Sequence, residues 1–393
     1  MDRTDDPCTT PRDGNNPNIY SQELSTGPYS LLTGSPYDQA APPPTYLSIN
    51  YLNRVRPTDK ESQLQGYEFI PEGGLKCIDE RVLSNQRGII LDVIAQVSAC
   101  LIKGKGVVGL SLPIRLFEPR STLERMLDRW SFMPAFFNNI AEHNHLERFK
   151  RVIAMAVAGL YISPSQEKPF NPLLGETLQA EWPDGTKAYC EHTVHHPPVT
   201  NFYILGREFK MYGHLELTGK FKKNSLVGGL QGKVNVEFND GQIVTFTYPQ
   251  FKAGGIIMGT RTVNWEETMS FEDKQNQLSA NLVFGAARKK SLFKKAIGKV
   301  DDFKGELQQN GGKLCDIEGN WLSNLVIDGV EYWNINFQQP VFHYFSTYPL
   351  PSDWRYREDL VWLAKGNSEI SQKWKLKVEN KQRDDRKLRG LKH

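Results

Sequence analysis

The chain has 393 residues, of which 39% are hydrophobic and 24% charged, a composition typical of a globular protein with a substantial core. Its net charge of +3 is too small to indicate nucleic-acid binding, so a basic function must come from local clusters. The five scattered cysteines favour a reducing compartment over a disulfide framework. No signal peptide and no apolar stretch of about 20 residues is found, so we expect a cytoplasmic protein.

The chain is predicted to have an unfolded start and one large folded domain. Residues 1–46 are rich in Pro, Gly, Ser, Asn and Asp, and we expect a disordered tail because they cannot bury enough apolar surface to fold. Residues 47–84 carry mixed signals and are interpreted as a linker or a partly ordered extension. The folded domain is expected over residues 85–393.

Three helices are predicted ahead of the strands. Residues 88–102 are apolar on nearly every side, and the segment is too short to cross a bilayer. Ser121 and Glu124 fit a capping box at the start of a second helix. A third helix is expected over about residues 145–162, where apolar residues recur at helical spacing.

From about residue 177 apolar residues recur at every second position instead of at helical spacing, which predicts strands. The hairpin signature is clearest at residues 234–248, where two alternating segments flank an Asp-Gly turn. Similar turns at residues 184, 310 and 328 extend the pattern into one antiparallel meander that ends near Tyr348. We expect this sheet to close on itself because closure removes exposed edges. The charged, basic segment that follows is helical in pattern.

Two patterns resemble sites that their surroundings do not support. Residues 104–109 match GxGxxG, but the strand and helix that a dinucleotide site requires are missing. The cluster His192, His195 and His196 has no second Cys/His group to complete a zinc site. The sequence contains no GxSxG, Walker or HExxH motif. We therefore expect no enzyme, no cofactor and no metal.

Two polar motifs flank the first predicted strand of the sheet. Residues 168–176, KPFNPLLGE, place Lys168 and Asn171 among turn-forming residues, a pattern that also fits a plain connection with a solvated lysine. Residues 191–198, EHTVHHPP, carry the adjacent pair His195 and His196. Imidazoles that titrate near physiological pH can donate hydrogen bonds to an anion, although two structural histidines fit equally. Only one would point into a barrel unless the chain turns at the prolines.

A third polar motif lies on the predicted C-terminal helix. Lys375, Glu379 and Arg383 share one helix face because they are spaced by four residues. Such a face is either a solvated ion-pair ladder or a phosphate site in which the acidic residue holds two cations together.

Taken jointly, these segments resemble the lipid-binding domain of the oxysterol-binding-protein-related family. KPFNPLLGE and EHTVHHPP, in that order, are similar to its two signature sequences. Further matches lie at residues 116–121, 319–321 and 349–359, and the resemblance covers roughly residues 85–390. His192 and Val194 depart from the family pattern, which usually has Gln and Ser there.

The resemblance implies a mainly β fold with flanking helices: a large, incomplete antiparallel β-barrel around a lipid tunnel, with N-terminal helices, a lid supplied by residues 88–102 and a C-terminal helix. It implies a tunnel that binds phosphatidylinositol 4-phosphate and exchanges it for sterol or another lipid such as phosphatidylserine. The residues that it implies for the headgroup are Lys168, Asn171, His195, His196, Lys375, Glu379 and Arg383.

We therefore expect a monomeric lipid-transfer protein that is peripheral on intracellular membranes. The alternative is a sensor or scaffold that binds the same lipid without net transport. The run of residues 288–295, RKKSLFKK, mixes cations with apolar side chains. It is expected to contact an anionic bilayer transiently, although a solvated basic loop has the same composition.

Overall fold

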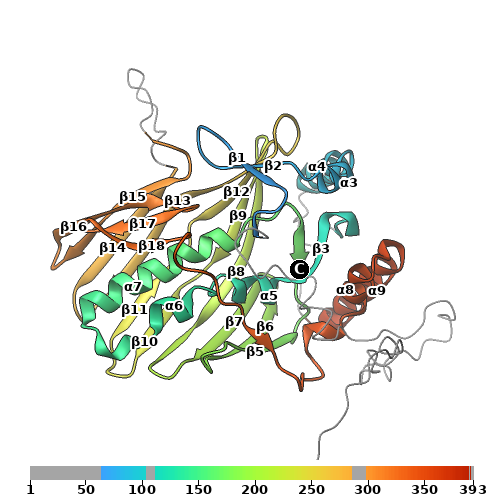
Figure 1. Ribbon diagram of the computed structural model, residues 1–393. Helices are drawn as coiled ribbons and strands as arrows, with labels where there is room; N and C mark the ends of the chain where they lie inside the picture. The colour runs from blue at the N-terminus through green and yellow to red at the C-terminus, as the bar shows by residue number, and fades with distance from the viewer. Residues whose placement is uncertain (1–62, 103–110, 286–297, 389, 391–393) are drawn as a thin grey trace, which may run out of the picture.

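The computed structural model describes residues 63–102, 111–285, 298–388 and 390, and it is built around one 17-stranded antiparallel sheet (Figure 1). The sheet curls around helices that lie across its concave face. A separate parallel pair, β3 (Phe117–Ser121) and β4 (Lys168–Phe170), leads from the helices toward the sheet. The predicted mainly β fold with flanking helices is confirmed.

The strands of the sheet follow the alternation of apolar residues along the chain. In chain order they are β1 (Tyr67–Phe69), β2 (Leu75–Cys77), β5 (Thr177–Glu181), β6 (Lys187–His195), β7 (Pro198–Leu205), β8 (Phe209–Lys222), β9 (Ser225–Gln231), β10 (Val234–Phe238), β11 (Ile243–Phe246), β12 (Gln250–Gly254), β13 (Thr262–Asp273), β14 (Leu278–Phe284), β15 (Asp302–Gln309), β16 (Gly312–Asn320), β17 (Asn324–Ile327), β18 (Val330–Asn334) and β19 (Tyr344–Phe345).

Two long strands, β8 and β13, interrupt the single meander that the sequence predicts. The start of β8 pairs with β10 and its end with β9. Likewise, the start of β13 pairs with β12 and its end with β11. Each long strand can therefore hold two shorter strands end to end, and β9 pairs with β12 rather than with its sequence neighbour β10.

The edges of the sheet stay apart, so the barrel is incomplete. Within the described residues, β18 pairs only with β17 and β19 only with β5. β2 pairs with β13, so residues 67–77 are part of the sheet. The predicted hairpin of β10 and β11 forms, and so do the turns at residues 184, 310 and 328.

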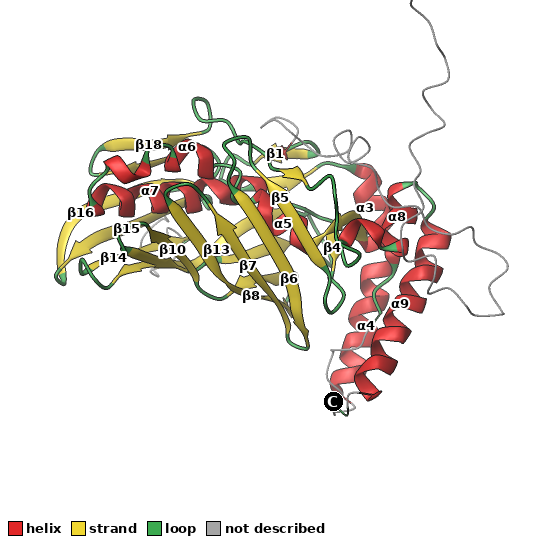
Figure 2. Cartoon of the chain, turned by 90° about the horizontal axis from the view of Figure 1, so that it is seen from below, coloured by secondary structure: helices red, strands yellow, loops and turns green. Residues whose placement is uncertain are grey.

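Most helices occur where the sequence predicts them. They are α3 (Glu80–Gln86), α4 (Ile89–Ile102), α5 (Thr122–Asp128), α6 (Met133–Phe137), α7 (His145–Ala158), α8 (Glu358–Ala364) and α9 (Ser368–Leu388), with short 3₁₀ turns at Ile114–Leu116, Ile140–Glu142, Gly159–Ile162 and Trp354–Tyr356. Helices α6 and α7 lie over the sheet, whereas α3, α4, α8 and α9 gather at one end of it (Figure 2).

Helix α7 packs against the sheet and covers much of its apolar face. Its apolar side chains, among them Phe149, Val152 and Ile153, are fully buried. The Tyr332 hydroxyl of β18 donates a hydrogen bond of 2.7 Å to Glu147 of this helix. The helix thus covers the edge that the sheet leaves open, which keeps the apolar interior closed at that side.

Helix α5 starts at the predicted residue, but the reciprocal contact of a capping box does not form. Ser121 Oγ accepts a 3.3 Å hydrogen bond from the Leu123 N–H, while the Glu124 carboxylate lies 2.7 Å from Arg120. Arg120 is buried and also contacts Asp128. A buried guanidinium needs a countercharge, and this need outweighs a capping bond to a backbone N–H.

Candidate functional site

A cavity of 2310 Å³ opens between the sheet, the N-terminal helices and α9. Much of its wall is apolar and comes from α5 and strands β8, β9 and β12, as well as from Ile90 and Val93 of α4. Six apolar side chains of this wall are Met126, Leu217, Leu226, Leu230, Phe251 and Ile256. The helix that was predicted as a lid therefore borders the cavity.

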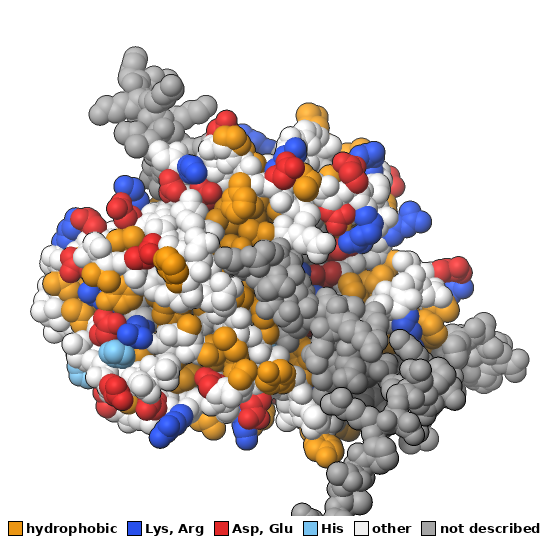
Figure 3. Space-filling model, viewed as in Figure 1, with side chains coloured by type: hydrophobic (Ala, Val, Ile, Leu, Met, Phe, Trp, Pro, Cys, Tyr) orange, Lys and Arg blue, Asp and Glu red, His pale blue; other side chains and the backbone are white. Residues whose placement is uncertain are grey.

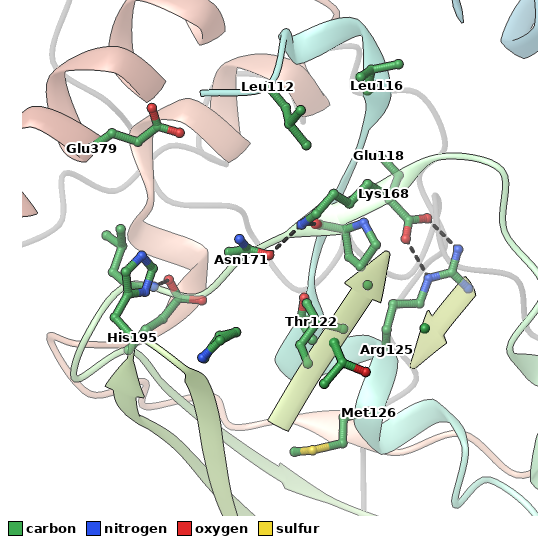
Figure 4. Close-up of a pocket in the computed structure, with 18 of the residues that line it drawn as sticks. Leu112, Leu116, Glu118, Thr122, Arg125, Met126, Lys168, Asn171, His195 and Glu379 are labelled. Atoms are coloured by element: carbon green, nitrogen blue, oxygen red, sulfur yellow. Dashed lines mark hydrogen bonds and ion pairs between the residues drawn. The ribbon is translucent and has the colours of Figure 1, made fainter. Parts of the chain in front are cut away.

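The residues predicted for the headgroup meet at one end of this cavity, although they are far apart in sequence. Six of the seven line it, namely Lys168, Asn171, His195, His196, Glu379 and Arg383. The seventh, Lys375, is 2% exposed and lies directly behind Glu379. Lys168, Asn171, His195 and Glu379 surround the same space in Figure 4.

Lys168 is held by strand pairing and is not a freely solvated side chain. It pairs with Phe117 in the parallel β3–β4 register, and its Nζ donates to the Pro169 carbonyl at 3.1 Å and contacts Asn171 Oδ1. The ammonium groups of Lys168 and Lys375 lie 5.2 and 5.3 Å from the centre of the Phe117 ring. One aromatic ring thus has two cations beside it.

This crowding of cations affects the protonation of Lys168. Burial, together with the charges of Lys375 and Arg357, lowers the pKa of Lys168 to about 7, and the carboxylates of Glu118 and Glu379 oppose the change only in part. The ammonium is therefore easily lost near neutral pH in the empty site. An anion placed between the cations would favour the protonated form.

The histidine pair reaches the cavity because the chain reverses at the prolines. Strand β6 ends at His195 and pairs with Pro198, the first residue of β7, so the tight turn brings both His195 and His196 to the cavity wall. Their ring centres are 4.7 Å apart. The sequence argument allowed this outcome only if the chain turned there, and it does.

His192 supports the pair from behind. Its ring is 1% exposed, with Nδ1 3.1 Å from Thr200 Oγ1 and Nε2 3.2 Å from His195 Nδ1. Burial first, then the neighbouring histidines and Arg357, lower the pKa of His192 to about 3 and that of His195 to about 4. The expectation that His195 titrates near physiological pH is wrong for this site, because its ring is withdrawn from water among like charges.

The Lys-Glu-Arg face of α9 forms as a connected ladder. Lys375 Nζ lies 2.5 Å from Glu379 Oε1 and donates to Ser111 Oγ at 2.9 Å. The other oxygen of Glu379 lies 3.5 Å from Arg383, whose side chain is 43% exposed. A fully solvated face is thus the wrong description for Lys375, whereas Arg383 is partly exposed and also donates a 2.7 Å hydrogen bond to Asn380 Oδ1.

Arg357 is a residue of the site that sequence reasoning missed. It is buried, pairs with Asp359 at 2.8 Å and with Glu176 at 3.2 Å, and donates a 2.5 Å hydrogen bond to the Asn171 carbonyl. It therefore ties the segment before α8 to the loop that carries Asn171. Its position within the matching residues 349–359 was the only sequence signal for it.

Surface charge outside the cavity is mixed. Acidic and basic side chains alternate with apolar ones over the face in Figure 3, with no field of a single sign. Within residues 63–102, 111–285 and 298–388, no three His, Cys, Asp or Glu side chains gather as metal ligands. The GxGxxG match at 104–109 and the basic run at 288–295 lie outside the described residues.

No helix in the described part of the chain is both long enough and apolar enough to span a membrane.

Comparison with known proteins points to one family. The family model described as oxysterol-binding protein matches residues 94–346. Oxysterol-binding protein 9 of Dictyostelium discoideum is 36% identical over 337 residues, which cover 80% of this chain and 79% of that protein. Oxysterol-binding protein-related protein 8 of Homo sapiens is 29% identical over 285 residues, which cover 69% of this chain and 31% of that protein. The match thus spans about a third of the human relative.

Solved structures show the same fold. The Osh3 ORD of Saccharomyces cerevisiae, solved in complex with PI(4)P, superposes with a TM-score of 0.62 at 22% identity and covers 76% of this chain and 85% of that one. The Osh1 ORD domain in complex with ergosterol gives a TM-score of 0.59 at 19% identity, covering 74% and 78%.

Replacing Arg357 by Met should strongly destabilise the protein. The change leaves the carboxylates of Glu176 and Asp359 buried without their cation, which we expect to lower the free energy of unfolding by about 3–5 kcal/mol. Arg81→Met is the matched control, because Arg81 pairs with Glu167 at 3.4 Å but is 65% exposed, and its loss should cost at most about 1 kcal/mol. Urea unfolding of both variants measures the difference, and equal losses would contradict the role given to Arg357.

Proposed function

Since this chain belongs to the oxysterol-binding protein family, we propose that it encloses one lipid in its cavity and carries it between membranes. The lipid bound through its headgroup is phosphatidylinositol 4-phosphate, which exchanges for sterol or for another lipid such as phosphatidylserine. This proposal rests on one observation: the same cavity has an apolar wall and a cluster of cations.

The cation cluster matches a phosphate group in charge and position. When Lys168 is protonated, Lys168, Lys375 and Arg383 carry three positive charges, and Glu379 between the last two offsets only one. Asn171, His195 and His196 add hydrogen-bonding groups, and the lowered pKa of His195 keeps that ring neutral near pH 7. A phosphate withdrawn from water must be paired with cations, which makes this end of the cavity suitable for a phosphorylated headgroup.

The apolar wall matches the body of a lipid. Burial of apolar surface contributes about 25 cal/mol per Å², so removing about 400 Å² of lipid from water would contribute on the order of 10 kcal/mol before ordering costs. A volume of 2310 Å³ provides room for a body of this size. The headgroup site then selects the ligand, while the wall supplies most of the affinity.

An exposed apolar patch beside the cavity supports transient contact with a membrane. Phe221 and Ile257 are 40% and 41% exposed and Met258 is 72% exposed, at the tips of the β8–β9 and β12–β13 turns. Asn224 holds the two turns together, since its Oδ1 accepts a 2.7 Å hydrogen bond from the Ile257 N–H. The exposed lysines 220, 222 and 223 lie on the same hairpin, a combination that suits an anionic bilayer surface.

Removing both cavity histidines should abolish headgroup recognition while leaving the apolar wall intact. We expect the wild-type protein to extract phosphatidylinositol 4-phosphate from liposomes in a one-to-one ratio, and the His195→Ala/His196→Ala variant to extract at least about tenfold less. Sterol uptake by the variant should be unchanged, and Lys304→Ala, a change of an exposed side chain on β15, should behave as wild type.

The outcomes of this extraction separate the parts of the proposal. If neither protein extracts the phosphoinositide but both take up sterol, the lipid tunnel stands and the headgroup site is wrong. If the phosphoinositide binds but never moves from one liposome population to another, the protein is a sensor or scaffold.

The affinity for phosphatidylinositol 4-phosphate should fall as the pH rises above 7. Lys168, with a pKa of about 7 in the empty site, must be protonated to pair with the phosphate, so binding takes up a proton. The second ionisation of the phosphate, near pH 6, is complete in this range and adds no further change. We expect binding to weaken about fivefold between pH 7 and pH 8, and Lys168→Arg to remove this dependence because arginine stays charged. The same slope in both proteins would contradict the assignment.

A further inference from the structure

Arg129, the residue that follows α5, is a partly buried cation that the headgroup site does not use. It lines the cavity one helical turn beyond Arg125, whose charge is offset by Glu118. The Nη1 atom of Arg129 is buried without a hydrogen-bond partner, and no carboxylate in the described part of the chain pairs with it. Figure 4 shows Thr122, Arg125 and Met126 of the same helix at the cavity wall.

The buried arginines of the described residues are all paired. Arg120 contacts Glu124, Arg148 contacts Asp240, Arg355 contacts Asp353 and Arg357 contacts Asp359. A buried guanidinium without an anion is unfavourable, because its hydration is lost and nothing replaces it. Arg129 is only partly buried, but it has no such carboxylate partner among the described residues.

Two aromatic rings lie near the Arg129 guanidinium. Its central carbon lies 5.1 Å from the Tyr248 ring centre and 5.4 Å from that of Trp265. A neighbouring ring stabilises the charge of a guanidinium but does not replace the hydrogen-bond acceptors that its N–H donors need. The Tyr248 hydroxyl accepts a 2.9 Å hydrogen bond from Trp130, and burial raises the pKa of Tyr248 to about 12, so it supplies no negative charge at neutral pH.

The backbone of Arg129 is fixed in place. An added Cβ on Gly159 would lie 2.0 Å from the Arg129 carbonyl oxygen, which shows how closely the end of α5 packs on the segment after α7. Burial, with the nearby Arg125, lowers the pKa of Arg129. The group nevertheless remains charged, because arginine does not lose its proton in proteins. A cation without a carboxylate partner in the described residues thus lines an otherwise largely apolar cavity.

We propose that Arg129 is a second polar subsite of the tunnel, and that it binds the carboxylate of an apolar ligand, either a fatty acid or a sterol that carries a carboxylate. One guanidinium balances a monoanion, and its planar fork matches the two oxygens of a carboxylate. A phosphate dianion would need a second unpaired cation, and Arg125 is already occupied by Glu118. This inference rests on the proposed function of the cavity and adds a class of ligand to it.

Calorimetric titration of the full chain with matched ligands tests the subsite. Oleate is compared with oleyl alcohol, and a sterol with a side-chain carboxylate, 3β-hydroxy-5-cholenate, with cholesterol. The wild type should bind at least one carboxylate about tenfold or more tightly than its uncharged partner. Arg129→Met should bind both members of that pair equally, while Arg129→Lys should keep part of the preference. The oleate and cholenate arms show which carboxylate the site takes.

Two controls make the result decisive. Lys304→Met, on an exposed side chain of β15, should bind all four ligands as wild type. Each variant is also tested for extraction of phosphatidylinositol 4-phosphate, which Arg129→Met should retain. A wild type without preference for either carboxylate, or an Arg129→Met variant that keeps the preference, would overturn the subsite. Loss of all lipid uptake by the wild type would overturn the proposed function itself.

Discussion

The repulsion between two cations beside one aromatic ring is the constraint on which the site depends. Lys168 and Lys375 come from opposite ends of the domain, and both ammonium groups lie near the ring of Phe117. Glu379 pairs with Lys375 but leaves Lys168 without a carboxylate partner of its own in the described residues, and burial, together with the charges of Lys375 and Arg357, lowers the pKa of Lys168. A bound phosphate would offset this repulsion, because an anion between the cations favours their charged forms.

The rest of the structure holds these cations in place. The parallel pair β3–β4 positions Lys168 against Phe117, and α9 brings Lys375 from the end of the chain. Arg357 joins the two regions through Glu176 and the Asn171 carbonyl. The curled sheet supplies the apolar wall, because long strands such as β8 and β13 hold shorter strands end to end and leave a wide interior. A lipid would thus meet charge at one end of the cavity and hydrocarbon along its wall.

Local sequence patterns predicted the helices and strands of this fold well, since the spacing of apolar residues and the residue types at turns depend only on neighbouring positions. Helix α7 and the hairpin at residues 234–248 are examples. The order of strands around β8 and β13 could not be predicted, because it depends on pairing between distant segments. Arg129 was missed for a similar reason: its surroundings, with Tyr248 and Trp265 beside it and no carboxylate partner in the described residues, depend on how the sheet folds. The lowered pKa of His195 likewise depends on burial that sequence spacing does not record.

Sterol transfer between two liposome populations tests the central claim most directly. Donor liposomes contain a fluorescent sterol, and acceptor liposomes contain either phosphatidylinositol 4-phosphate or the same amount of phosphatidylinositol, which lacks the 4-phosphate. If one cavity binds either lipid in turn, the 4-phosphate should accelerate sterol delivery to the acceptors, with one phosphoinositide returning for each sterol delivered. Equal sterol transfer to both acceptors, with no phosphoinositide returning, would contradict the account.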